Sequence, residues 1–199
     1  MTARDFLRIV ALAAAVAGVA DVPAFAHAAV AALKERALGT FGAWHAYVYN
    51  EGGQTVCYMV TTKLIKPTDA RKRADPYLMI THRPIEASTD VVSYGAGLRL
   101  DSWRDVTIRI DQSRFDLFSV RDTAWTRDAQ TDHRLAAAIR SARLARITGF
   151  PGKKGAKKIT DQFNLSGAAA AYRAIGRACG LLPDIPRKPT IPRRHRRRT

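Results

Sequence analysis

Aromatic and β-branched residues alternate with polar ones in short runs along most of the chain, which predicts strands rather than long helices. The clearest case is the stretch 40–62, where two such runs flank Glu51-Gly52-Gly53-Gln54. Glycine tolerates the positive φ of a tight reversal, so this stretch is predicted to be a β-hairpin. Its tryptophan and tyrosines have large apolar rings, which suit the wall of a small β core.

Further segments have the same pattern. They are 77–83, 90–94, 105–111 and 115–120, with 123–126 as an extension. The cleanest alternation is in 105–111, where Val106, Ile108 and Ile110 share one face of a half-buried antiparallel strand. The polar stretch 65–76 is bounded by prolines and is predicted to be a surface loop.

Two later segments have the period of amphipathic helices. The first has an apolar stripe after a cap at Asp128 or Thr131; the stripe is Leu135, Ala138, Ile139 and Ala142. Between the helices, 144–150 and 157–165 are predicted to form a second hairpin with a basic tip.

The last segment, 166–180, has Ser166 as its expected N-cap and Gly180 at its expected end. Its apolar positions place Cys179 on the packing face, together with Ala168, Tyr172 and Ile175.

Few helical segments separate the early strands, so parallel crossovers are not expected. With about eight short strands and two late helices, residues 40–182 are predicted to form one mainly β domain. Its expected architecture is an antiparallel β-sandwich or flattened barrel with one or two short helices packed outside.

The first 26 residues have the parts of a secretory signal peptide. Arg4 and Arg8 flank the start of an apolar run, and Ala24-Phe25-Ala26 fits the small-x-small rule for cleavage. The run, about 12 residues, is shorter than the roughly 20 that a spanning helix needs. We therefore expect cleavage near Ala26, no transmembrane span afterwards, and a periplasmic, secreted or cell-surface protein. Residues 27–39 are expected to be a mobile lead-in.

Composition adds one unusual feature, a formal net charge of +16 and a pI near 10.6. Residues 183–199 are rich in proline and arginine and are predicted to be a disordered tail. The candidate anion-binding residues are Arg71, Lys72 and Arg73 in the loop, Lys153, Lys154, Lys157 and Lys158 at the hairpin tip, and Arg193, Arg194, Arg196, Arg197 and Arg198 in the tail.

A flexible polycation binds lipopolysaccharide, acidic glycans or nucleic acid by counterion release. The expected partners are therefore anionic envelope or host-surface polymers, although a solvated, dispensable tail is the alternative. No aromatic residue interleaves the tail, so base stacking has no support there. The sequence names no protein partner.

Cys57 and Cys179 are the only cysteines. Two cysteines in an exported chain favour a disulfide, here between the first hairpin and the last helix, with free buried thiols as the alternative. Closing a loop of about 120 residues stabilises a fold by roughly 4–5 kcal/mol. A zinc site would need adjacent histidines, and a redox site favours a C-x-x-C pair.

No catalytic, metal or cofactor pattern is present in the sequence. His45, His82 and His133 have no ligand spacing, and Gly95-x-Gly97 lacks the rest of a dinucleotide fingerprint. The lysine tip lacks the phosphate-loop pattern, and Asp161 beside it is expected to form a surface ion pair. We expect no enzyme, no cofactor and no small-molecule substrate. A hydrolase with an unrecognised site would instead need a pocket in which a histidine lies beside a carboxylate.

An ordered set of short motifs covers residues 39–180. The set is Phe41-Gly42-Ala43-Trp44, Val56-Cys57-Tyr58, Thr81-His82-Arg83-Pro84, Asp122-Thr123-Ala124-Trp125, Leu135-Ala136-Ala137-Ala138, and Thr160-Asp161-Gln162-Phe163-Asn164-Leu165-Ser166-Gly167 leading to Cys179. With this order and spacing, the chain resembles the invasion-associated locus B family of exported alphaproteobacterial proteins.

The resemblance implies a β-rich periplasmic or surface-associated protein without established enzymatic activity. In pathogenic relatives, the family is linked to entry into host cells, notably erythrocytes. This chain differs in its arginine-rich tail and at Ala43 and His45, near where relatives often have an acidic residue or glycine.

Overall fold

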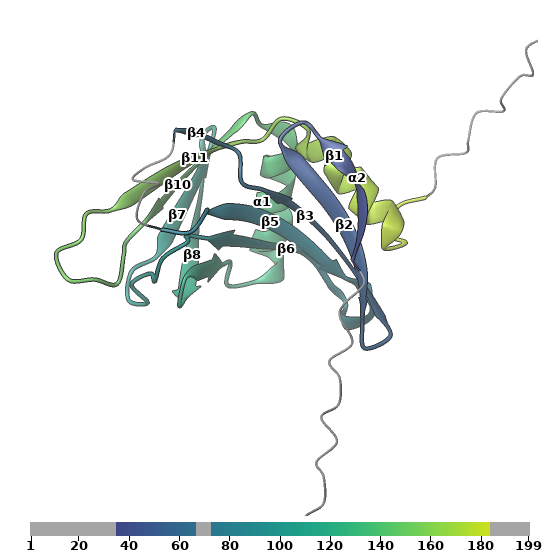
Figure 1. The fold of residues 1–199 in the computed structure, drawn as a ribbon, viewed down its shortest axis with the longest axis horizontal. Helices are drawn as coiled ribbons and strands as arrows, with labels where there is room; N and C mark the ends of the chain where they lie inside the picture. The colour runs from purple at the N-terminus through teal and green to yellow at the C-terminus, as the bar shows by residue number, and fades with distance from the viewer. Residues whose placement is uncertain (1–34, 67–72, 184–199) are drawn as a thin grey trace, which may run out of the picture. The chain divides into compact units, whose positions relative to one another are not determined.

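The computed structural model describes residues 35–66 and 73–183. Within them, eleven strands form one antiparallel sheet, and two α-helices pack on one of its faces (Figure 1). The strands are β1 (Arg36–Phe41), β2 (Trp44–Glu51), β3 (Gln54–Thr61), β4 (Leu64–Lys66), β5 (Tyr77–Arg83), β6 (Ser88–Gly95), β7 (Val106–Ile110), β8 (Ser113–Val120), β9 (Thr123–Trp125), β10 (Leu144–Gly149) and β11 (Ile159–Asn164). The helices are α1 (Ala129–Ser141) and α2 (Ala168–Ala178), and a short 3-10 turn, η2, covers Pro84–Glu86.

The strand order is β1-β2-β3-β5-β6-β9-β8-β7-β10-β11-β4. The mainly β, antiparallel prediction with two helices is confirmed. The strands form one continuous sheet that curls, so the architecture corresponds to the flattened-barrel alternative rather than to two facing sheets. The predicted hairpins are β2–β3 and β10–β11, and Gly52 and Gly53 have φ of +58° and +84° at the first reversal.

The predicted boundaries were wrong at two places. Residues 36–39 belong to β1 rather than to a lead-in, because their backbone pairs with β2. The predicted loop 65–76 begins with part of β4, which pairs with β11. The predicted signal peptide 1–26, residues 27–34 and the predicted tail from 184 onward lie outside the described residues.

The helix caps agree with the sequence in part. Asp128 caps α1, because its Oδ1 accepts the backbone N–H of Thr131 at 2.7 Å, and Gly180 follows α2 with φ of +68°. The prediction of Ser166 as the N-cap of α2 was wrong. The cap is Gly167, which has a φ of +93° that favours glycine. A Cβ atom at this position would lie only 1.9 Å from the Phe41 carbonyl oxygen, so no side chain fits there. Among the described residues, no helix is both long and apolar enough to span a membrane.

Side chains from distant strands meet on the helix-covered face. Tyr94 on β6 and Phe163 on β11 have ring centroids 6.2 Å apart, although these strands are fifth and tenth in the sheet order. This contact requires the sheet to curl around that face, which is therefore the concave one. Figure 1 shows the curl and the helices. The buried core lies inside it, with Met59, Ile80 and Ile147 fully buried.

An ion pair joins the two sides of the curl. Both terminal nitrogens of the Arg73 guanidinium donate to the Asp161 carboxylate, and Tyr94 Oη donates to Asp161 Oδ2 at 2.6 Å. Arg73 Nη1 also donates to the Ala96 carbonyl oxygen at 2.9 Å. Burial and the Asp161 charge raise the pKa of Tyr94, so its hydroxyl remains a donor.

These contacts correct two sequence predictions. The Arg73 side chain is 2% exposed and pairs inside the fold, so it is not part of an anion-binding surface. Asp161 is fully buried rather than part of a surface pair with the lysine tip, because the β10–β11 register places it opposite Ile147 on the concave face.

We predict that Asp161→Asn lowers the free energy of unfolding by about 3–5 kcal/mol, because it removes the carboxylate that pairs with the buried Arg73 charge. Urea unfolding measures the loss. Asp105→Asn, which breaks an exposed pair with Arg127, is the matched control and should change stability by less than about 1 kcal/mol. Equal effects of the two substitutions would contradict the structural role of Asp161.

Candidate functional site

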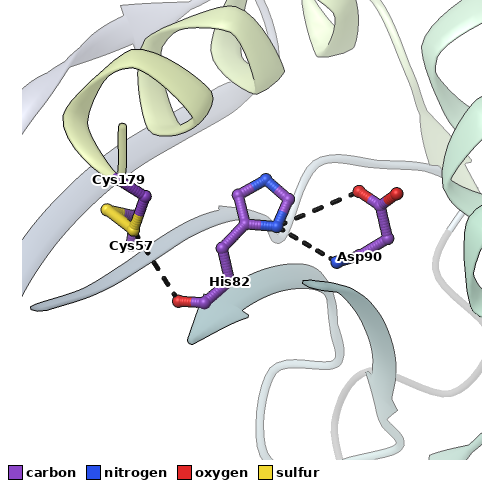
Figure 2. Close-up of a disulfide and its surroundings, with 4 residues drawn as sticks. All are labelled: Cys57, His82, Asp90 and Cys179. Carbon is purple, nitrogen blue, oxygen red and sulfur yellow. Dashed lines mark hydrogen bonds and ion pairs between the residues drawn. A yellow bond between two sulfur atoms is a disulfide. The ribbon is translucent and has the colours of Figure 1, made fainter. Parts of the chain in front are cut away.

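A disulfide joins the sheet to the last helix (Figure 2). It links Cys57 on β3 to Cys179 at the end of α2, with Cα atoms 6.0 Å apart and 122 residues between them in sequence. The predicted disulfide is therefore confirmed. A bond of this kind is typical of an oxidising, extracytoplasmic compartment. The Cys179 sulfur also lies 3.8 Å from the His82 carbonyl oxygen. This contact is not a hydrogen bond, because the disulfide sulfur carries no hydrogen.

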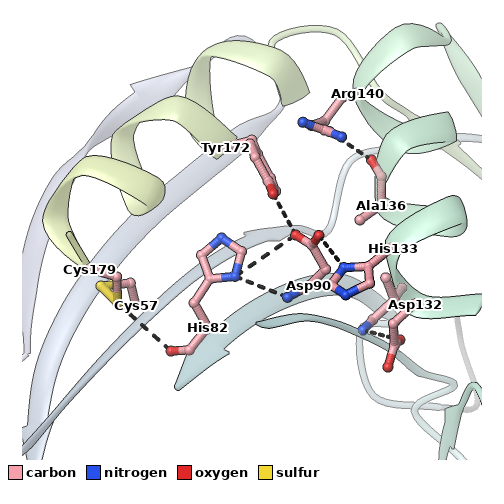
Figure 3. A network of polar contacts seen from close by, with 10 residues as sticks. Cys57, His82, Asp90, Asp132, His133, Ala136, Arg140, Tyr172 and Cys179 are labelled. Atoms are coloured by element: carbon pink, nitrogen blue, oxygen red, sulfur yellow. Dashed lines mark hydrogen bonds and ion pairs between the residues drawn. A yellow bond between two sulfur atoms is a disulfide. The ribbon is translucent and has the colours of Figure 1, made fainter. Parts of the chain in front are cut away.

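Beside the disulfide, one carboxylate holds groups from both helices (Figure 3). Asp90, at 8% exposure on β6, accepts the Tyr172 hydroxyl of α2 on Oδ1 at 2.6 Å. Its Oδ2 lies 2.7 Å from Nδ1 of His133 on α1. The backbone N–H of Asp90 donates to Nδ1 of His82 on β5 at 3.1 Å. The network thus ties α1 and α2 to adjacent strands of the sheet.

His82 is buried and neutral. Its Nδ1 accepts a hydrogen bond, so the ring proton lies on Nε2, which has no hydrogen-bond partner within the described residues. Burial lowers the pKa of His82, the nearby Asp90 charge opposes that shift, and Arg140 and His133 add to it. The imidazole packs edge-on against Tyr172 with centroids 5.3 Å apart.

Tyr172 is held from both sides. The Arg140 guanidinium lies 4.2 Å from the centroid of its ring, while the hydroxyl donates to Asp90. Burial, together with the hydrogen bond and charge of Asp90, raises the pKa of Tyr172 to about 12. Asp132 on α1 accepts the backbone N–H of Val92 at 2.8 Å, a second link between this helix and the sheet.

The network includes the histidine–carboxylate pair that the hydrolase alternative requires. Asp90 orients His133, whose side chain is 52% exposed and lines a small pocket of about 210 Å³. Among the described residues, no hydroxyl or thiol hydrogen-bonds to His133, so the hydrogen-bonded pair is limited to His133 and Asp90. Within the same residues, no cluster of three or more acidic, histidine or cysteine side chains is placed to hold a metal ion.

The predicted anion-binding residues are found in three different situations in the structure. Lys153, Lys154, Lys157 and Lys158 are exposed in the β10–β11 connection. Arg73 is buried, as described above. Arg71, Lys72 and the tail arginines 193–198 lie outside the described residues.

The structure also brings together arginines that sequence reasoning did not group. Arg114 on β8 lies opposite Arg109 on β7, and Arg109 lies opposite Arg146 on β10, so the three form one row across adjacent strands. All three are exposed, on the convex face that neither helix covers. The alternation along β7 predicted that Arg109 faces solvent, but only the strand register places it between the others.

The arginine row (Arg114, Arg109 and Arg146) carries more positive than negative charge. Asp116 pairs with Arg114 at 2.9 Å, and hydrogen bonds from Arg114, together with the charges of Arg114 and Arg109, lower its pKa. Within the described residues, no ion pair neutralises Arg109 or Arg146. Thr107, Thr148 and Phe150 help to line a groove of about 470 Å³ beside the row, where the Arg104 guanidinium stacks over Phe150.

The curled antiparallel sheet, two helices on its concave face and a disulfide to the last helix define the class of fold. It is the fold of invasion associated protein B: the crystal structure of that protein from Bartonella henselae aligns with a TM-score of 0.51 and 16% sequence identity. The alignment covers 70% of this chain and 95% of that one. No protein-family model and no curated protein matches the chain. The structural likeness supports the fold expected from the sequence motifs.

We predict that replacing both cysteines with alanine lowers the free energy of unfolding by about 4–5 kcal/mol, because the unfolded chain loses a 122-residue loop closure. Urea unfolding of the oxidised wild type and of the double variant measures this difference. Thiol titration under denaturing conditions provides the control and should detect no free thiol in the wild type. Two titratable thiols, or equal stabilities, would contradict the role of the bond.

We also predict that the protein loses stability as pH falls below 6.5, the ordinary pKa of histidine. The folded state holds His82 neutral, so the unfolded state binds the proton at higher pH and is stabilised relative to the folded state on acidification. His82→Asn, which keeps an acceptor near the Nδ1 position, should flatten the dependence between about pH 5 and pH 7. Urea midpoints measured across this range test it, and parallel curves for the two proteins would refute it.

Proposed function

We propose that this protein is an exported, non-catalytic binding protein of the cell envelope or cell surface that holds anionic polymers. The observation that carries the proposal is the arginine row, in which three exposed arginines occupy directly opposed positions on adjacent strands. Like charges opposite one another on a sheet are destabilising, so a row of this kind suggests a role other than stability.

Export is supported by the disulfide, which is typical of oxidising compartments, and by the expected signal peptide. The exposed lysines of the β10–β11 connection extend the positive surface from the same strand that bears Arg146. An anionic polymer bound there would release counterions, which gives affinity and a steep dependence on salt.

The non-catalytic part of the proposal is supported by the use of the Asp90 network. Its hydrogen bonds join β5, β6, α1 and α2, a structural task that accounts for each of its side chains. The related crystal structure bears the name invasion associated protein B. We propose that, for this chain, anion binding would contribute to such a process by attaching the protein to anionic polymers on a host surface.

We predict that Arg109→Gln combined with Arg146→Gln weakens retention on immobilised heparin and lowers the slope of log affinity against log salt by about 2, one for each lost contact. Arg173→Gln on the exposed side of α2 removes the same kind of charge from the opposite side of the sheet and is the control. Equal retention of all variants would overturn the proposal.

The tail requires its own variant. Deletion of residues 183–199 should reduce retention in low salt if the tail adds counterion release to the row. If retention is unchanged, the tail has no part in binding and the folded surface alone accounts for it.

A further inference from the structure

We propose that the convex face of the sheet binds an acidic polysaccharide, with sugar rings on an aromatic groove over β3 and β5 and acidic groups on the arginine row. This inference rests on the proposed function and adds the chemical class of the polymer and a second contact region. The ligand class is a saccharide, because the groove combines aromatic rings with groups that can bind hydroxyls.

The aromatic groove has a volume of about 610 Å³, within the range of ligand sites. Its lining is Glu35, Tyr49, Tyr58, Val60, Tyr77, Met79, Thr81 and Arg83. The tyrosine rings support one another: Tyr58 stacks on Tyr47 with centroids 5.1 Å apart and meets Tyr49 edge-on at 6.1 Å. Supported rings of this kind offer a firm apolar surface against which a sugar ring can pack.

Polar groups lie at the edges of this apolar floor. Tyr58 Oη donates to the Glu35 carboxylate, and Arg83 pairs with Glu51 while its Nη2 lies 3.4 Å from Tyr49 Oη. Carboxylate and guanidinium groups can accept from and donate to adjacent sugar hydroxyls.

Aromatic side chains also lie on the strands between the aromatic groove and the arginine row. Met79, Ser93, Trp125 and Phe118 lie in one cross-strand row through β5, β6, β9 and β8. Phe118 and Trp125 have ring centroids 6.1 Å apart, and Arg127 lies 5.7 Å from the Phe118 ring centroid. Asp116 and Arg114 follow on the same face of β8.

The distance between the tyrosines of the groove and the arginine row sets a minimum length for the ligand. From β3, which bears Tyr58, to β7, which bears Arg109, there are five strand intervals, or about 24 Å at the usual separation. A single sugar cannot reach from the tyrosines to the arginines, whereas an oligosaccharide of several units can. Neither helix covers this track, because both pack against the concave face through the disulfide and the Asp90 network.

The experiment compares Tyr49→Leu, which removes the ring, with Tyr49→Phe, which keeps it. The probes are a heparin octasaccharide, inorganic tripolyphosphate and single-stranded oligothymidylate, each titrated into the full mature chain by calorimetry. We expect Tyr49→Leu to weaken octasaccharide binding by about three- to tenfold and Tyr49→Phe to bind as the wild type does. Tripolyphosphate binding should be equal in all three proteins, because it needs only the arginines.

A second readout follows the track directly. In a Trp103→Phe background, Trp44 is buried and Trp125 is the remaining partly exposed indole, so the octasaccharide should shift its fluorescence and tripolyphosphate should not. Circular dichroism and thermal unfolding check that every variant is folded.

The outcomes separate the two proposals. If Arg109→Gln weakens both anions but Tyr49→Leu weakens neither, the proposed function stands and the saccharide track is overturned. If oligothymidylate binds more tightly than the octasaccharide and depends on Tyr49, the polymer is a nucleic acid and this inference is wrong. If no anion binds the wild type, the proposed function itself fails.

Discussion

The alternation of side chains along each strand is the constraint on which this molecule depends, because it separates a concave face from a convex one. On the concave face, alternate residues of β3, β5 and β6 pack into the core and against the helices. The intervening residues face outward, where neither α1 nor α2 covers them. A register shift by one residue would exchange the two faces, so the buried contacts also fix the position of every convex-face side chain.

The buried polar interactions described above are on the concave side, where they act as structure. The disulfide fastens the end of α2 to β3, and the Asp90 carboxylate joins both helices to the sheet. Asp161 on β11 pairs with Arg73, which precedes β5, and accepts the Tyr94 hydroxyl of β6, a strand that is not its neighbour in the sheet. Such rigid support is what a binding surface requires, since side chains held by a fixed sheet lose little freedom on binding. The exposed arginine row then lies on a face whose shape the core determines.

The sequence predicted elements better than it predicted their partners. Local periodicity was enough to place the hairpins, α1 and α2, and the compartment argument paired Cys57 with Cys179. Local patterns could not show that Asp161 and Arg73, 88 residues apart, meet inside the curl, so both were assigned to the surface. The grouping of Arg109, Arg114 and Arg146, and the convergence of His82 and His133 on Asp90, likewise depend on strand register and helix docking. The sequence did not reveal Gly167 as the N-cap of α2, because Ser166, one residue earlier, is of a residue type that is common at helix N-caps.

We propose that the convex face is the binding face and that the concave face is structural. Hydroxyl-radical footprinting of the protein, with and without a heparin octasaccharide, tests it most directly. We expect the octasaccharide to lower the radical reactivity of convex-face side chains, above all of Tyr49, Trp125 and Phe118. The reactivity of exposed side chains on α1 and α2 should be unchanged. Protection confined to the two helices, with the convex face as reactive as in the free protein, would contradict it.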